Sequence, residues 1–354
     1  MPLQYKKLGN YIREVDVKNT DLKVSLLLGV SITKKFIPSI ANIIGTDLSK
    51  YKIVRKGQFA YGPVTSRNGD QVSIALLEDN ECIISTSYTV FEISKPEELL
   101  NEYLMLLFSN PEFDRYARYN SWGSAREIFS WDELCNTELY LPDIEEQKSI
   151  VREYQVIFDN KNIIEKENKI LESLAYTIYT ETIENCTEWH EINLGISTKI
   201  SAGGDNPSDT TLVKTEKCQI PVYSNGVTDD GLYGYTSKAK INEESITISA
   251  RGTVGYTALR MHPYTPIVRL ISIIPNDNNM IEFLYMYFKY LKYDDDGSVQ
   301  QQATKPYFEA MNINIPKNIV EFKNKIRPIL NLIENNKQKC KLLERVLSLR
   351  LSTM

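Results

Sequence analysis

This chain of 354 residues carries one order of predicted elements twice, and that duplication constrains its fold more than any other feature. The motif KLG at residues 7–9 corresponds to NLG at residues 193–195, and EYLMLLF at residues 102–108 corresponds to EFLYMYF at residues 282–288. The offset between matched positions drifts between roughly 174 and 188 residues, so the copies differ in loop length but keep their order. A repeat of this length is a whole domain rather than one unit of a solenoid.

Each copy is followed by a long segment with the periodicity of a coiled-coil helix. Residues 143–182 contain no Gly or Pro, and apolar residues recur there at every seventh position, alternating with a second core position. These two sets are Ile150, Ile157, Ile164, Leu171 and Ile178, and Tyr154, Lys161, Asn168 and Ala175. The core positions of the final segment are Phe322, Ile326, Ile329, Ile333, Asn336, Cys340, Leu343 and Leu347. We predict two long helices, the first capped by Asp143 and spanning roughly 58 Å for about 39 residues.

Polar residues interrupt both predicted seams. Neither helix is expected to form a stable homodimer, because polar residues at core positions fix partner and register at a cost in stability. These polar residues are Lys161, Asn168 and Asn336. We therefore expect the two helices to pair with each other within one chain, leaving a second face of the first helix for other proteins. The expected docking residues are Phe158, Ile163, Ile170 and Leu174. An ordinary helical hairpin without external partners is the alternative.

The composition is that of a globular protein, with 42% hydrophobic and 25% charged residues. There is no apolar run of about 18 residues, and the N-terminus lacks a signal-peptide pattern, so a cytoplasmic location is expected. Five cysteines are scattered without a Cys-x-x-Cys pair, and the chain has only two histidines. A zinc site or a disulfide framework is therefore not expected.

The net charge of −5 has the wrong sign for a free-standing nucleic-acid binder, but the average conceals an asymmetry. Residues 1–67 carry 12 Lys or Arg against 4 Asp or Glu, a net of +8, whereas residues 68–142 carry 4 against 14, a net of −10. A basic face could therefore survive folding in the first copy. If the chain binds DNA, much of the phosphate neutralisation is expected from partner subunits.

No catalytic constellation can be assembled from the sequence. The string RGTVG at residues 251–255 lacks the Lys-Ser/Thr ending of a phosphate-binding loop. Asp143, Glu146 and Lys148 lie within one helical turn, which favours helix capping over a nuclease metal site. A complete enzyme, such as a nuclease or methyltransferase, and a protein-binding scaffold nevertheless stay open as alternatives.

Polar loops in both copies are rich in side chains that grip phosphates or read base edges. Arg can bind guanine, and Asn or Gln can bind adenine, through two hydrogen bonds. Arg251 stands out because its predicted hairpin is flanked by glycine and could approach a partner closely. The predicted DNA-binding residues are Lys34, Lys35, Tyr61, Arg67, Arg118, Ser124, Arg126, Tyr223, Asn225, Arg251, Arg260, Gln301 and Lys305.

The order block, Leu-Pro, helix, block, Ile-Pro, helix resembles the specificity subunit of type I restriction-modification systems. The resemblance is carried by GSAR at residues 123–126 leading into LPDIEEQK at residues 141–148, by PVYSNG at residues 221–226 and by ISARGTVG at residues 248–255. It covers nearly the whole chain. The second helix departs from the pattern, because its start, IPKNIVEF at residues 315–322, lacks the EEQK string.

The resemblance implies an α+β fold. Two similar mixed α/β target-recognition domains would each be followed by a long helix, and the helices would pair as an antiparallel coiled coil with pseudo-twofold symmetry. The expected boundaries are residues 1–142 for the first domain, 143–184 for the central spacer helix, 185–316 for the second domain and 317–354 for the C-terminal spacer helix.

The resemblance also implies a non-catalytic subunit that reads a bipartite, asymmetric site in double-stranded DNA. Its helices would dock two methyltransferase subunits, and a restriction (motor) subunit could join them. S-adenosylmethionine, Mg²⁺ and ATP would be bound by those partners, and this chain would bind no cofactor itself. A specificity subunit of a type IIB system is the nearest alternative.

Overall fold

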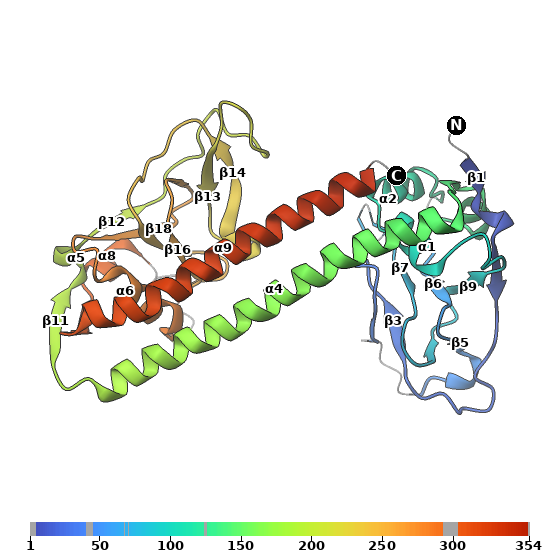
Figure 1. The fold of residues 1–354 in the computed structure, drawn as a ribbon, viewed down its shortest axis with the longest axis horizontal. Helices are drawn as coiled ribbons and strands as arrows, with labels where there is room; N and C mark the ends of the chain where they lie inside the picture. The colour runs from blue at the N-terminus through green and yellow to red at the C-terminus, as the bar shows by residue number, and fades with distance from the viewer. Residues whose placement is uncertain are drawn as a thin grey trace. The chain divides into compact units, whose positions relative to one another are not determined.

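The computed structural model describes residues 5–39, 45–66, 68–69, 71–123, 126–292 and 304–352. The chain divides into two compact units: unit 1 is Met1–Ile164 with Gln338–Met354, and unit 2 is Glu165–Lys337. Each unit contains one mixed α/β part and a section of both long helices. These helices are α4 (Ile144–Asn185), green in Figure 1, and α9 (Ile319–Ser352), red in Figure 1.

Unit 1 is built around a four-stranded antiparallel sheet in the order β2-β9-β6-β7. Its strands are β2 (Ile12–Val15), β6 (Phe59–Tyr61), β7 (Ile74–Leu76) and β9 (Thr89–Ile93). Three strand pairs accompany it: β1 (Tyr5–Lys7) with β10 (Glu138–Tyr140), β3 (Leu28–Val30) with β4 (Phe36–Pro38), and β5 (Lys52–Val54) with β8 (Cys82–Ile84). Aromatic and β-branched residues favour these strands, and Phe59 stacks on Phe91 across β6 and β9 with ring centroids 5.0 Å apart.

Short helices cover the core of unit 1. They are η1 (Leu8–Asn10), η2 (Leu48–Lys50), α1 (Asn101–Phe108), α2 (Pro111–Tyr119) and α3 (Trp131–Asn136). The sequence sets the start of α2, because Asn110 Oδ1 accepts a hydrogen bond from Glu112 N at 3.0 Å and Pro111 occupies the first helical position. Phe108 of α1 then packs edge-on against Phe59, which joins the helices to the sheet.

Unit 2 repeats this plan around a sheet in the order β12-β18-β15-β16. Its strands are β12 (Thr198–Ala202), β15 (Ser245–Ile248), β16 (Thr257–Arg260) and β18 (Ile271–Pro275). A strand pair, β11 (Trp189–Asn193) with β19 (Asn312–Pro316), and a second sheet, β14 (Leu232–Thr236), β13 (Ile220–Tyr223) and β17 (Thr265–Pro266), complete it. Its short helices are α5 (Leu194–Ser197), η3 (Thr228–Gly231), α6 (Ile281–Tyr290) and α8 (Lys305–Glu309).

The repeated sequence motifs occupy equivalent places in the two units. In each unit the first strand of the central sheet lies beside the last, and an antiparallel hairpin follows on the far side. Gly9 and Gly195 mark the same close approach: a Cβ added there would lie 2.8 Å from Cys135 Cβ in unit 1 and 2.6 Å from the Glu309 carbonyl oxygen in unit 2. Only glycine fits such a contact without a shift of the neighbouring short helix. The predicted duplication of an α+β domain is therefore confirmed.

The predicted helical seams are also confirmed. Asp143 Oδ1 accepts hydrogen bonds from Glu145 N at 3.0 Å and Glu146 N at 2.9 Å, and α4 extends over 42 residues. In unit 1, Lys161 pairs with Glu344 at 2.6 Å and Glu153 with Arg350 at 3.5 Å. Residue numbers fall along α9 as they rise along α4, so the helices are antiparallel there.

In unit 2 the same two helices pair around a polar pair at the core. Asn336 Nδ2 donates to Asn168 Oδ1 and to Glu167 Oε2, both at 3.0 Å. Tyr179 packs against Phe322 further along, again in antiparallel order. The polar residues that interrupt the two seams thus find partners across the helix pair, as expected for groups that fix register.

Candidate nucleic-acid interface

In unit 2, the hairpin between β15 and β16 presents Arg251 to solvent. Ser249 N donates to Tyr256 O and Gly255 N donates to Ser249 O, each at 2.9 Å, which closes the turn. Gly252 and Gly255 have φ of +67° and +84°, a left-handed backbone that favours glycine. The RGTVG string is therefore an exposed turn, and it places Arg251 as predicted from its glycine flanks.

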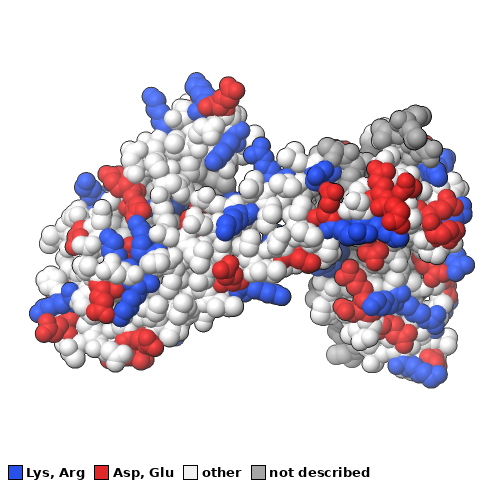
Figure 2. All heavy atoms as spheres, viewed as in Figure 1, with Lys and Arg blue, Asp and Glu red and all other residues white. Residues whose placement is uncertain are grey.

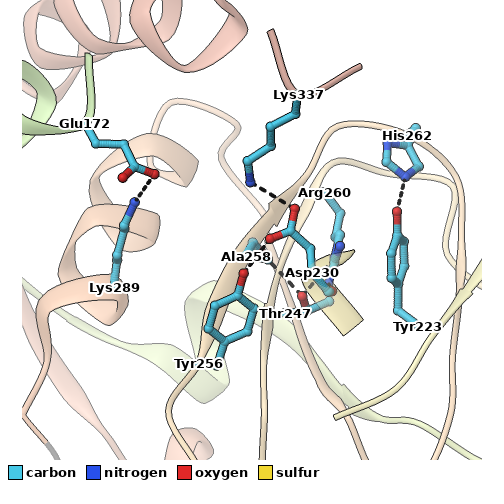
Figure 3. A network of polar contacts seen from close by, with 10 residues as sticks. All are labelled: Glu172, Tyr223, Asp230, Thr247, Tyr256, Ala258, Arg260, His262, Lys289 and Lys337. Carbon is cyan, nitrogen blue, oxygen red and sulfur yellow. Dashed lines mark hydrogen bonds and ion pairs between the residues drawn. The ribbon is translucent and has the colours of Figure 1, made fainter. Parts of the chain in front are cut away.

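Arg260 lies in the interior, contrary to the expectation that it contacts DNA. Its side chain is 3% exposed, and its guanidinium lies 3.6 Å from the centroid of the Tyr223 ring. Arg260 Nε donates to Thr247 Oγ1 at 2.9 Å, and Nη2 donates to the Asp230 carbonyl oxygen at 2.6 Å (Figure 3). Arg260 is therefore a structural cation that joins β16 to the loop after β13.

Tyr223 and Asn225 are also used within the fold. Burial raises the pKa of Tyr223 to about 12, and its hydroxyl bonds to His262 Nε2 at 3.0 Å. Asn225 Oδ1 accepts from Ala250 N at 2.8 Å, and Asn225 Nδ2 donates to Val268 O at 2.6 Å. Each atom of the Asn225 amide thus holds main chain, and DNA contact by this side chain stays a prediction.

Asp230 anchors the same loop to α9. Its carboxylate accepts from Tyr256 and from Lys337 Nζ, the latter at 2.9 Å, as Figure 3 shows. Burial opposes ionisation of Asp230, but the cations Lys337 and Arg260 and the Tyr256 hydrogen bond outweigh it, so the pKa of Asp230 lies below its usual value. Beside this network, Glu172 of α4 accepts from Lys289 of α6 at 3.2 Å.

In unit 1, Lys34 is withdrawn from solvent. Its Nζ lies 2.5 Å from Asp114 Oδ1 and donates to Val72 O at 2.8 Å, and both side chains of the ion pair are 12% exposed. Burial lowers the pKa of Lys34, and the bond to Asp114 offsets part of that effect. Lys34 therefore ties its loop to α2, which corrects the expectation that it contacts DNA directly.

Tyr61 is a core residue, again contrary to expectation. The side chain is 1% exposed in the central sheet, and its ring packs edge-on against Phe91. A phenol at this depth cannot reach a base edge. Burial also raises the pKa of Tyr61, so the hydroxyl stays neutral.

Several predicted residues do lie at the surface. Lys35 is exposed, with Nζ 5.9 Å from the centroid of the Phe158 ring. Arg118 forms an ion pair with Glu127, and Arg126 is exposed. In unit 2, Lys305 is exposed and lies 3.4 Å from Glu309 Oε1. Arg67, Ser124 and Gln301 fall outside the described residues, and DNA contact by all the exposed residues stays a prediction.

Charges of both signs are interleaved on one face of the protein, rather than separated as the sequence averages suggested. On the face drawn in Figure 2, Lys and Arg side chains lie among Asp and Glu side chains in both units. The basic first segment of unit 1 pairs with its acidic second segment, as in Arg13 with Glu92 at 2.5 Å and Arg55 with Glu81 at 4.0 Å. Folding therefore neutralises part of the local charge asymmetry of the sequence.

The second face of α4 is exposed, with one correction. Ile163, Ile170 and Leu174 are 62%, 69% and 46% exposed. Phe158 is 37% exposed, but at about 100° per residue it lies roughly 140° around the helix from Ile163, with its ring centroid 5.9 Å from Lys35 Nζ. Val156, 60% exposed and seven residues before Ile163, takes its place, and the heptad spacing would have identified it. Docking by any of Phe158, Ile163, Ile170 and Leu174 stays a prediction.

Other surface features escaped the sequence reasoning. Tyr119 at the end of α2 and Trp122 shortly after it are 79% and 66% exposed in unit 1, and Arg269 is exposed on a turn of unit 2. Among the residues described, no helix combines the length and apolar composition that a membrane crossing needs. Within those same residues, no three His, Cys, Asp or Glu side chains are grouped to hold a metal ion.

Comparison with known families gives a consistent result. The model described as "Type I restriction modification DNA specificity domain" matches residues 42–174 and 188–345, one match in each half of the chain. A putative type I specificity subunit of Mycoplasma pneumoniae is 31% identical over 302 residues, covering 81% of each chain. Another from the same organism is 33% identical over 146 residues, and there this chain matches only 44% of the relative's length and 40% of its own.

A solved structure shares the fold. The crystal structure of a type I restriction-modification system S subunit from M. genitalium superposes with a TM-score of 0.64 at 15% sequence identity. The match covers 98% of this chain and 94% of that one. At this identity the likeness establishes the architecture alone.

Proposed function

Because this chain belongs to the family of type I restriction-modification DNA specificity subunits, we propose that it supplies sequence recognition to a complex that modifies and restricts DNA. The observation that carries the proposal is the duplicated central sheet, matched twice by the family model. Each copy supports its own set of surface turns. Two related but unequal readers are what a bipartite, asymmetric DNA site requires.

Each unit would read one half-site through its loops. Exposed Arg251 in unit 2, and exposed Lys35 and Arg126 in unit 1, are side chains suited to phosphate oxygens or to guanine edges. The chain has a net charge of −5, and the charges that folding brings together partly cancel. Affinity for DNA would therefore depend on basic surfaces of partner subunits, with this chain contributing selectivity.

The partners would be two methyltransferase subunits docked along the helices, joined by a restriction subunit. The exposed aliphatic residues of α4 support this, because solvent-facing Ile at heptad spacing on a long helix fits a partner helix or groove. S-adenosylmethionine, Mg²⁺ and ATP would be bound by those partners, and catalysis would take place there. This chain would position the complex on its target.

The first test is co-purification and target determination. The chain would be tagged, expressed with a type I methyltransferase subunit, and isolated as a complex, and the methylated motif would be read by methylome sequencing. We expect a split motif with a fixed spacer that disappears when this chain is omitted. Methylation of an unchanged motif without this chain would refute the proposal. Binding of labelled S-adenosylmethionine by the isolated chain would favour a complete methyltransferase instead.

The length of the DNA spacer between the two half-sites offers a second test. Inserting one heptad in α4 after Ile164, and a matching heptad in α9 after Lys337, lengthens both helices by about 10 Å while preserving their phase. At about 3.4 Å per base pair, we expect the preferred spacer to grow by about three base pairs with both half-sequences unchanged. A changed half-sequence with the original spacer would contradict a spacing role. A partner that both methylates and cuts would point to the type IIB alternative.

A further inference from the structure

We infer that Arg269 is a second DNA-contacting arginine of unit 2, that it acts as a pair with Arg251, and that Asn225 positions the two. This inference rests on the proposed function. The observations behind it concern two turns that are 18 residues apart in sequence but joined in the fold by one side chain. Arg269 was not among the residues that the sequence singled out.

The main-chain contacts of Asn225 join the two turns. Asn225 Oδ1 accepts from Ala250 N at 2.8 Å, next to Arg251, and Asn225 Nδ2 donates to Val268 O at 2.6 Å, next to Arg269. The two atoms of an amide are about 2.3 Å apart, so Ala250 N and Val268 O lie within about 8 Å of each other. Two extended arginines on such turns can reach neighbouring base pairs, which are about 3.4 Å apart.

The turn that carries Arg269 is held in an unusual conformation. Val268 and Arg269 have φ of +51° and +61°, and a β-branched residue rarely adopts the left-handed region. Val268 N donates to Gly204 O at 2.9 Å and Arg269 N donates to Gly203 O at 2.8 Å. A Cβ on Gly203 would lie 2.7 Å from the Ile267 backbone, so the turn is clamped by a segment that only glycine permits. Strain maintained in this way is typical of functional turns.

The guanidinium groups of the two turns are available. Residues 188–316 contain three arginines, and Arg260 is committed to the interior. Arg251 and Arg269 are exposed, and among the residues that the structure describes neither has an ion pair or side-chain hydrogen bond. An exposed, unpaired guanidinium on a fixed backbone is preorganised to bind phosphate or guanine through two hydrogen bonds. Ala250 N and Val268 O each hold one atom of the Asn225 amide, so this side chain is committed to positioning the two turns.

The experiment uses the intact complex with its methyltransferase partner and the duplex defined by its methylome. Fluorescence anisotropy measures affinity for the cognate duplex and for duplexes in which either half is scrambled. We expect Arg269→Ala and Arg251→Ala each to weaken cognate binding about tenfold or more, and both to lose discrimination at the same half only. Lys199→Ala, an exposed residue at the end of β12 that lies away from Gly203, serves as the matched control and should bind as wild type.

Asn225→Asp tests the positioning role. Aspartate keeps the acceptor for Ala250 N but removes the donor to Val268 O, so the Arg269 turn should loosen and the Arg251 turn should hold. Its effect should therefore be smaller in the Arg269→Ala background and undiminished in the Arg251→Ala background, with thermal unfolding confirming that each variant is folded. Wild-type binding by Arg269→Ala, or equal loss at both halves, would overturn the inference alone. A wild-type complex without sequence preference would overturn the proposed function as well.

Discussion

The Asn168–Asn336 pair gives a quantitative prediction about how the helices of unit 2 stay in register. Asn336 is 1% exposed and donates two hydrogen bonds of 3.0 Å, one to Asn168 and one to Glu167. A net hydrogen bond contributes about 0.5–1.5 kcal/mol, and the exposure of Glu167 weakens its share. Asn336→Ala removes both bonds and leaves a small void. We expect the free energy of unfolding to fall by about 1.5–3 kcal/mol.

The assay is calorimetry together with circular dichroism at increasing temperature, followed for the transition of unit 2. A loss of this size corresponds to a Tm lower by roughly 3–12 °C for a unit of this length. Lys339→Ala on the exposed side of α9 is the control and should change stability by less than about 0.5 kcal/mol.

A double-mutant cycle decides whether the pair acts together. Asn168→Ala and Asn336→Ala should show a coupling of about 0.5–1.5 kcal/mol. Each single leucine substitution should destabilise because it strands the partner amide, whereas the double leucine variant should recover wild-type stability or exceed it. Alanine effects that add within about 0.3 kcal/mol would refute the argument that the two amides pair across the seam.

Two further predictions concern a buried acid and the exposed helix face. Glu282 is fully buried, with its Oε1 3.4 Å from Arg327 Nη1, and burial raises its pKa. The folded state therefore resists ionisation of Glu282. The free energy of unfolding should fall as the pH rises from the unfolded-state pKa of about 4.3 through the raised pKa of the folded state. In thermal unfolding, Glu282→Gln should therefore become more stable relative to wild type as the pH rises from 4 to 7. Exposed Glu243→Gln serves as the control and should show no such change. An equal loss of stability by Glu282→Gln at pH 4 and at pH 7 would contradict this. Ile163→Glu with Ile170→Glu should abolish methyltransferase co-purification, since burying each Ile contributes about 1.5–3 kcal/mol, or roughly tenfold to a hundredfold in affinity. Lys169→Glu, on another side of α4, should retain the partner, and retention by the double Ile variant would place docking elsewhere.

The long-period features of this protein could be predicted from its sequence. Heptad spacing identified the core positions of both long helices, because a helix repeats one geometry over many residues. It also identified the polar residues at those positions, which are Lys161, Asn168 and Asn336. The duplication could also be predicted, since Gly9 and Gly195 each allow the close approach of a neighbouring short helix in their own unit. Local chemistry repeated at fixed spacing is visible without knowledge of the tertiary fold.

The fate of individual charged side chains could not be predicted in this way. Lys34 is buried because Asp114 and the Val72 carbonyl, far along the chain, accept hydrogen bonds from its ammonium group. Arg260 is buried because the Tyr223 ring and the Asp230 carbonyl oxygen meet it from other elements. Whether a cation faces solvent depends on partners that only tertiary structure supplies. A list of basic loop residues drawn from the sequence therefore contains both candidate DNA-contacting residues and cations that are used within the fold.

The burial of equivalent side chains also differs between the two copies of the repeat. This difference is relevant to how two DNA-recognition domains can diverge from one duplicated domain. The repeated motif at residues 102–108 and 282–288 places a glutamate early in α1 and in α6. Glu282 is fully buried beside Arg327, whereas Glu102 is exposed and lines a groove of about 780 Å³. The sheets and glycine contacts constrain the backbone, but they leave side-chain surroundings free to diverge. Binding turns attached to such a frame can change their specificity in one unit without disturbing the other.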